Sequence, residues 1–277
     1  MSREAWTRYW AGGGPGCLPE AKGPIAAAQR KVWQEFAQTL PKGARVLDLA
    51  TGSGAVPRWM AEARRDLKLT GVDSASALPT APSGIVLKGG VSIASLPFRD
   101  GHFGAATSQF GFEYCADPAR SNELARVLAP GAPLLMIVHH SESAIVAHNR
   151  ARRDALRWAM ATHLPKAKAF AATGLPVPPA FAQLPASAPH PAAAEFLAGL
   201  VQRLYARAPI APLEADALGE IERIGELEAA ARDSEQIAAL VAELQAAGLA
   251  IDPPRPLADP QSDRPLAWLV SGSGTSR

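Results

Sequence analysis

Long hydrophobic runs are missing from this chain of 277 residues. Its longest strongly apolar stretch, residues 134–138, is far too short to cross a bilayer, which takes about 20 apolar residues. The first ten residues also lack the apolar segment of a secretory signal peptide. We therefore expect a soluble, cytoplasmic protein with no membrane insertion.

Cysteine is scarce, because only Cys17 and Cys115 occur. Two cysteines without a paired pattern fit a reducing cytoplasm better than a disulfide-stabilised exterior. No cysteine or further histidine at a recognisable spacing completes a tetrahedral set around the adjacent residues His139 and His140. The sequence therefore predicts no metal site.

An excess of one charge is also absent, since the formal net charge is only +2 at pH 7. Proteins that bind nucleic acids or anionic membranes usually carry a strongly basic face. No basic groove is evident in this sequence, so we expect no nucleic-acid partner.

A strand, a glycine turn and a helix follow one another in residues 45–63. The apolar run at residues 46–49 predicts a buried strand. Gly52 and Gly54 then form a tight turn, and helical character begins at Val56. Glycines let the backbone approach a bound molecule closely, and a helix N-terminus offers unpaired N–H groups. This order predicts a ligand cradle.

Two acidic residues near this turn favour one kind of ligand. A dinucleotide site usually has a third glycine, which this chain lacks after Gly54. Asp73 ends a second apolar stretch, where a carboxylate can accept both ribose hydroxyls of an adenosine. Asp48 lies inside the motif, where its charge opposes a diphosphate and suits an ammonium or sulfonium group. The pattern favours S-adenosylmethionine over NAD.

Four segments resemble the class I S-adenosylmethionine-dependent methyltransferases, nearest the branch with the ubiquinone and menaquinone C-methyltransferases. They follow the family's order and approximate spacing across residues 43–140. The segments are Val46-Leu-Asp-Leu-Ala-Thr-Gly-Ser-Gly54, Gly71-Val-Asp-Ser74, Ala94-Ser-Leu-Pro-Phe-Arg-Asp-Gly-His-Phe103 and Asn122-Glu-Leu-Ala-Arg-Val-Leu-Ala-Pro-Gly131. The resemblance implies an α/β, Rossmann-like fold. Its seven-stranded sheet would be mostly parallel with the last strand antiparallel, and a largely helical insertion would follow strand five.

The expected cofactor is S-adenosylmethionine. Asp48 and the turn would hold its methionine part, and Asp73 its ribose. Where the family commonly has an aspartate that holds the adenine amino group, this chain has Ser92, which supplies no charge. The full set of predicted cofactor-binding residues is Asp48, Ala50, Gly52, Gly54, Asp73, Ser74, Ser92, Ile93 and Gln109.

Candidate catalytic side chains follow the fourth and fifth predicted strands, residues 103–108 and 134–138. These are Glu113, Tyr114, His139 and His140. Strand alternation sends the two imidazoles to opposite faces, so at most one of them faces the reaction. A neutral imidazole can take a proton from a hydroxyl, a thiol or an acidic carbon as the methyl group arrives. The alternatives are a histidine that caps the strand end and aromatic residues that plug the sheet, and the choice between the histidines stays open.

The chain divides into four predicted parts. Residues 1–42 form an N-terminal lid and helix, and residues 43–140 the cofactor-binding core. Residues 141–232 form a helical cap insertion, which by analogy covers the substrate pocket. Residues 233–277 return to the core with a helix, two closing strands and a loose tail. Seven prolines between positions 165 and 191 exclude a long regular element there.

Three aromatic residues precede the first strand: Trp6, Tyr9 and Trp10. They form either a lid over the cofactor and substrate or ordinary packing against the core.

These features predict an enzyme that transfers a methyl group from S-adenosylmethionine to a small organic acceptor. The alternatives are a catalytically silent protein that binds S-adenosylmethionine and an NAD-dependent oxidoreductase. The methylated atom, the acceptor and the oligomeric state stay open.

Overall fold

The computed structural model describes residues 6–7, 10 and 23–275. Tyr9 and Cys17 therefore lie outside the described residues. The chain divides into two compact units, one made of Met1–Ala144 with Ala230–Arg277 and the other of Ile145–Ala229. We call them the core unit and the helical unit. The four-part division remains a prediction about domain organisation.

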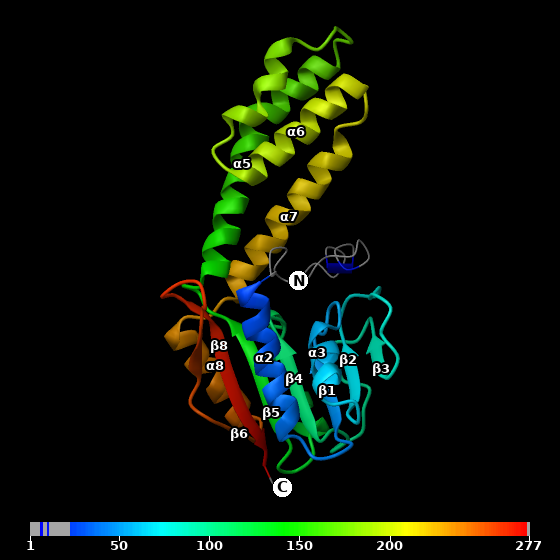
Figure 1. The fold of residues 1–277 in the computed structure, drawn as a ribbon, viewed down its shortest axis with the longest axis vertical. Coiled ribbons are helices and arrows are strands. Elements are labelled where there is room, and N and C mark those ends of the chain that lie inside the picture. Colours follow the sequence, from blue (N-terminus) through cyan, green and yellow to red (C-terminus); the bar gives the residue numbers. More distant parts are fainter. Residues whose placement is uncertain (1–5, 8–9, 11–22, 276–277) are drawn as a thin grey trace. The chain divides into compact units, whose positions relative to one another are not determined.

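The core unit is built on one sheet of eight strands (Figure 1). The strand order is β3-β2-β1-β4-β5-β8-β6, and β7 pairs with β8 beside this path. The bounds are β1 (Arg45–Leu49), β2 (Lys68–Val72), β3 (Ile85–Lys88), β4 (Ala105–Gln109), β5 (Pro133–His139), β6 (Leu249–Ile251), β7 (Arg255–Ala258) and β8 (Pro265–Gly274). The strands from β3 to β5 pair in parallel, whereas β8 runs antiparallel to β5, β6 and β7. The predicted fold class is confirmed, with eight strands instead of seven because β7 forms in the proline-rich link.

The central strands are buried on both faces, which explains their continuous apolar runs. In β5 every residue from Leu134 to His139 is buried. The apolar core joins side chains of β1, β4, β5 and β8 to those of two helices, α4 (Ala119–Val127) and α8 (Ser234–Ala246). Helix α8 begins with the predicted capping box between Asp233 and Gln236.

Two further helices of the core unit lie close to each other, α2 (Pro24–Thr39) and α3 (Ala55–Ala63). Helix α3 follows the glycine turn, and Gly54 is its N-cap in a left-handed conformation. A short 3₁₀ helix, η1 (Phe112–Tyr114), follows β4. None of the helices within residues 6–7, 10 and 23–275 combines the length and apolar character that a bilayer span needs.

The loose tail predicted at the end of the chain is wrong for residues 271–274. These residues extend β8, where they pair with both β5 and β6. The serine–glycine composition that suggested a tail has a packing reason instead. A Cβ on Gly272 would collide with the carbonyl oxygen of Ala250, and one on Gly274 would lie 2.8 Å from that of Ala129.

The helical unit contains the three helices expected from the apolar periodicity. They are α5 (Ala144–Ala171), α6 (Pro191–Ala206) and α7 (Ala211–Ala230), with the short 3₁₀ helices η2 (Pro179–Gln183) and η3 (Pro185–Ser187) between α5 and α6. Phe196, Leu197 and Leu200 of α6 are buried in a separate apolar core. Two arginines of α5, Arg150 and Arg153, pair with Glu228 of α7. They act as ion-pair partners between helices.

The expectation that prolines exclude regular structure from position 165 onward is wrong at its start. Helix α5 contains Pro165 and continues to Ala171. Proline removes one backbone donor and strains the turn before it. Here Leu164 and Ala167 are buried on either side, so packing of this face outweighs the local cost.

Candidate functional site

The glycine turn after β1 has the strained backbone of a ligand-binding loop. Ala50 adopts a φ of 53°, a left-handed conformation that is uncommon for residues other than glycine. Gly52 and Gly54 also have positive φ, at 50° and 72°. The backbone N–H of Gly52 donates to the carboxylate of Asp73 at 2.8 Å. The turn after β1 is thereby tied to the end of β2.

Asp48 is a buried acid on β1 that faces this turn. Its side chain accepts a hydrogen bond from the Thr107 hydroxyl of β4 at 2.8 Å. Burial raises the pKa of the Asp48 carboxyl to about 7. No cationic group contributes to this pKa among the described residues. An ammonium group placed here would gain a counter-charge, and it would lower the pKa of Asp48 again.

Asp73 follows β2 and uses both carboxylate oxygens for backbone contacts. One oxygen accepts from Gly52, and the other accepts from the N–H of Ala75 at 2.9 Å. Burial raises the pKa of this carboxyl, and these hydrogen bonds oppose the rise. Each carboxylate oxygen can accept about two hydrogen bonds. The group therefore keeps capacity for the two hydroxyls of a ribose.

Two cavities adjoin these acids. One is lined by Asp48, Gly52 and Gln109 among others, and the second by Ala50, Asp73, Ser74, Phe110, Gly111 and Tyr114. Trp10 lines both, and a Cβ on Gly52 would collide with its indole ring. The cavities measure about 40 and 50 Å³, far below the several hundred Å³ of typical small-molecule sites. The Trp10 indole therefore narrows the space at the glycine turn.

Trp6 and Trp10 pack together beside this site. Their rings stack with centroids 6.0 Å apart, and Trp6 meets the ring of Tyr114 edge-on at 5.8 Å. Both tryptophans pack against Ala75, next to Asp73. Sequence reasoning could not decide between lid and packing, and the structure places both indoles at the cavities. The third predicted residue of this group, Tyr9, is outside the described residues.

The end of β4 meets the end of β1. Phe110, which directly follows β4, has a φ of 53°. A left-handed residue therefore follows each of the two strands. A Cβ on Gly111 would collide with that of Ala50. Gln109, at the last position of β4, accepts a hydrogen bond from the Trp33 indole at 2.6 Å and lines the cavity of Asp48. The two turns therefore form one continuous wall of the site.

Of the four predicted catalytic residues, His139 and Glu113 form a buried pair. The Nδ1 atom of His139 lies 2.7 Å from Oε1 of Glu113, which also accepts the backbone N–H of His139 at 3.0 Å. The side chains are 1% and 0% exposed. Ring centroids of Phe110 and Tyr114 lie 4.2 Å and 5.7 Å from that of His139. Both aromatic residues line the cavity beside Asp73, so the imidazole lies directly behind the cavity wall.

His140 lies in different surroundings. Its ring stacks on the indole of Trp268 with centroids 4.5 Å apart. Its Nδ1 accepts the backbone N–H of Glu142 at 3.1 Å, and burial lowers its pKa. This arrangement is the strand-end cap that was one of the sequence alternatives.

Two predicted adenine contacts follow Val91, whose N–H donates to the carbonyl of Asp73 at 2.8 Å, and they stay a prediction. Ser92 and Ile93 are not among the described residues that line the two cavities. The Ser92 hydroxyl accepts the backbone N–H of Ala94 at 3.2 Å, and Ile93 belongs to the apolar core.

Several residues of the site were missed by sequence reasoning. Thr107 lies two positions before Gln109 on the same strand face, and this alternation could have indicated it. Phe110 and Gly111 lie between the predicted site residues Gln109 and Glu113. Arg232 contacts both members of the buried pair, through its backbone N–H to the carbonyl of His139 and its guanidinium to the carbonyl of Glu113. No sequence pattern singles it out.

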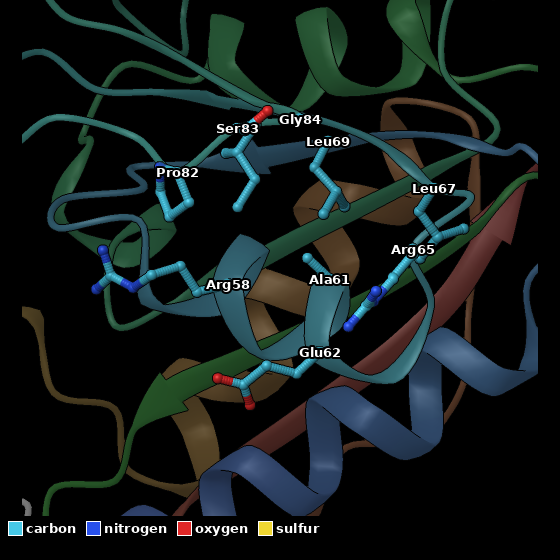
Figure 2. Close-up of a pocket in the computed structure, with 10 residues that line it drawn as sticks. Arg58, Ala61, Glu62, Arg65, Leu67, Leu69, Pro82, Ser83 and Gly84 are labelled. Atoms are coloured by element: carbon cyan, nitrogen blue, oxygen red, sulfur yellow. The ribbon is translucent and has the colours of Figure 1, made fainter.

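A larger hollow of about 460 Å³ lies between α3 and the loop before β3 (Figure 2). Arg58 and Glu62 of α3 line it together with Arg65, which follows the helix, and with Pro82 and Ser83 of the loop. No predicted site residue lines it. Volume alone therefore does not locate the candidate site.

Comparison with known proteins agrees with this geometry. Residues 47–136 match the family model described as a methyltransferase domain. This part of the chain is similar to known methyltransferase domains. A curated relative, the demethylmenaquinone methyltransferase of Thermus thermophilus, is 35% identical over 101 residues. That match covers 34% of this chain and 46% of the relative, so the chain spans less than half the length of the relative.

Solved structures of low sequence identity share the fold of this chain. A chain of the Haloferax volcanii complex that contains the Trm112 methyltransferase activator is 16% identical, with a TM-score of 0.52 and coverage of 98% of each chain. An S-adenosylmethionine-dependent methyltransferase of Thermotoga maritima is 10% identical, with a TM-score of 0.50 and coverage of 99% and 100%. The family-model match and the curated relative support the resemblance to the class I S-adenosylmethionine-dependent methyltransferases near the quinone branch. The match to the family model supports S-adenosylmethionine as the cofactor.

Proposed function

We propose that this protein is an enzyme that transfers a methyl group from S-adenosylmethionine to a small organic acceptor. The observation that carries the proposal is the pair of acids at the glycine turn. Asp48 is buried without a cationic partner in the described part of the chain, and Asp73 is joined to the turn through Gly52. A ligand with an ammonium group at one end and ribose hydroxyls at the other complements both acids.

The bound cofactor supplies an activated methyl group on a sulfonium, and the protein aligns the acceptor with it. In this proposal Asp48 holds the ammonium group and Asp73 the ribose hydroxyls. Gln109 is fixed by the indole of Trp33 and forms part of the wall beside Asp48. Trp6 and Trp10 exclude water from the site once the cofactor has entered. Alignment in a dry site provides most of the acceleration.

The proposed acceptor is small because aromatic rings, and no basic residue, line the described part of the cavity beside Asp73. A nucleic acid would require cationic contacts to its phosphates. A catalytically silent protein that binds S-adenosylmethionine is the competing function. Ser92, which supplies no charge where the resembled family commonly has an aspartate, is the feature that favours it.

Calorimetric titration tests the cofactor part of the proposal. We expect S-adenosylmethionine to bind and Asp73→Ala to weaken binding about 10- to 100-fold, as for the loss of hydrogen bonds to a charged group. Asp117→Ala is the control, because Asp117 also accepts a backbone N–H but does so at the start of α4. Binding of NAD without S-adenosylmethionine would overturn the proposal.

Incubation with S-adenosylmethionine carrying a labelled methyl group and a small-molecule cell extract tests the transfer. A labelled product identified by mass supports an enzyme. Cofactor binding without labelled product across a broad acceptor panel would instead indicate the silent protein.

A further inference from the structure

We infer that His139, oriented by Glu113, is the general base of the reaction, and that the acceptor is a weak acid with an O–H, S–H or acidic C–H group. This inference rests on the proposed function. It selects one histidine of the adjacent pair. It also favours an acceptor that becomes a strong nucleophile by losing a proton over a neutral amine, which attacks before it loses one.

Glu113 imposes one tautomer on the imidazole ring of His139. An ionised carboxylate only accepts hydrogen bonds, and Oε1 of Glu113 lies 2.7 Å from Nδ1 of His139. The same oxygen accepts the backbone N–H of His139, which fixes its position relative to the ring. The ring proton therefore resides on Nδ1, and Nε2 presents a bare lone pair. This is the form of imidazole that can accept a proton.

The pair of His139 and Glu113 does not use all of its hydrogen-bonding capacity. His139 Nε2 and Glu113 Oε2 are both buried and have no hydrogen-bond partner within the described residues. An unpaired buried polar atom costs free energy, so a purely structural site would be filled better by apolar residues. A substrate proton that reaches Nε2 gives this atom its missing partner.

The pair lies next to the cavity beside Asp73 and is held by Arg232. Phe110 and Tyr114 contact the imidazole on one side and line the cavity beside Asp73 on the other. Arg232 donates from its backbone to the carbonyl of His139 at 2.8 Å and from its guanidinium to that of Glu113 at 3.0 Å. A shift of the two rings opens the imidazole to the cavity, while Arg232 holds the pair in place.

In the proposed step the acceptor atom forms a bond to the methyl carbon. The bond between that carbon and sulfur breaks, and its electron pair stays on sulfur. The proton of the acceptor moves to Nε2 of His139. The resulting imidazolium is stabilised by the Glu113 carboxylate, and it later releases the proton to water.

The inference is tested without substrate by NMR of the histidine ring nitrogens, with His139 assigned through His139→Gln. We expect the tautomer protonated at Nδ1 in the wild-type protein. We expect Glu113→Gln to change it, because an amide can donate to Nδ1 and leave the proton on Nε2. A wild-type His139 protonated at Nε2 would overturn the inference.

Kinetics with defined probes give the second test: hydroquinone, thiophenol and acetylacetone as weak acids, and aniline as the amine. We expect methylation of at least one weak acid, reduced about 10²- to 10⁴-fold by His139→Gln. S-adenosylmethionine affinity should not change. Added imidazole should partly restore the rate of His139→Ala, which a structural role would not allow. The pH profile of the wild-type rate should differ from that of His139→Gln.

His140→Gln is the matched control, since it removes the neighbouring imidazole and should leave the pH profile unchanged. An unchanged rate in His139→Gln would overturn the inference while the proposed function stands, and so would methylation of aniline alone. Failure of the wild-type protein to methylate any weak acid while it binds S-adenosylmethionine also counts against it. Failure to bind S-adenosylmethionine would overturn the proposed function and this inference together.

Discussion

Asp48 illustrates how a single buried group can serve binding at the expense of stability. Its carboxyl has a pKa of about 7 in the folded chain, against the ordinary 3.8, because burial penalises the charge. Between these two values the folded state holds a proton that the unfolded state has lost. Stability contributed by this group is therefore present near pH 4 and is lost as the pH rises through about 7.

Asp48→Asn should remove this pH dependence. We expect the variant to be more stable than the wild type at pH 8, by up to about 4 kcal/mol, and to differ less at pH 5. Its affinity for S-adenosylmethionine should fall, because the ammonium group loses its counter-charge. Thermal unfolding at both pH values and calorimetric titration measure the two effects.

Asp66→Asn is the control, because the pKa of Asp66 is shifted in the opposite direction to that of Asp48. Asp66 is exposed, and its hydrogen bonds with Arg64 and with the N–H of Gly43 hold its pKa below the ordinary range. This variant should not gain stability at pH 8. Equal behaviour of the two variants would contradict the role of burial at Asp48.

At the scale of elements, the ends of β1 and β4 depend on each other. Ala50 and Phe110 both adopt left-handed conformations directly after or near these ends, and strain of this kind persists only where surrounding contacts enforce it. Gly111 permits the close approach, because a Cβ there would collide with that of Ala50. The shape of the glycine turn thus depends on a residue about 60 positions away in the chain.

Gly111→Ala should separate the two turns. We expect a loss of about 1–3 kcal/mol of stability, as for overpacking, together with weaker binding of S-adenosylmethionine. The matched control is Gly104→Ala, just before β4, where a Cβ would meet neighbours no closer than 3.8 Å. Chemical denaturation and calorimetry on both variants provide the measurement. Unchanged cofactor affinity in Gly111→Ala would mean that the turn after β1 keeps its shape alone.

At the scale of the whole molecule, each unit has its own apolar core. The core unit contains the two acids, the glycine turn and the buried pair of His139 and Glu113. The helical unit is stabilised by packing between its own helices and by ion pairs such as Lys168 with Glu214. A cavity in one core should therefore weaken that unit first.

Leu200→Ala tests this independence. Leu200 is fully buried in the helical unit, so we expect a cost of about 2–5 kcal/mol and faster hydrogen exchange in residues 145–229. Affinity for S-adenosylmethionine should stay within about twofold of the wild type. Leu218→Ala is the control, since Leu218 is 52% exposed and should change stability by less than about 0.5 kcal/mol. A parallel increase of exchange in the core unit would show that the two units unfold together.

The sequence by itself determined the features that depend on neighbours along the chain. The strand, glycine turn and helix around residues 45–63 and the capping box at Asp233 form through local propensity and short-range hydrogen bonds. The mostly parallel sheet follows from the family resemblance, and the two acids at the glycine turn follow from local signals and the same resemblance.

Only the tertiary structure decided the features that depend on distant segments. Glu113 and His139 are 26 positions apart, and their pairing requires the ends of β4 and β5 to lie together. Residues 271–274 look like a tail until β5 and β6 are present to pair with them. Side-chain partners brought together by packing, rather than local propensity, therefore distinguish His139 from His140.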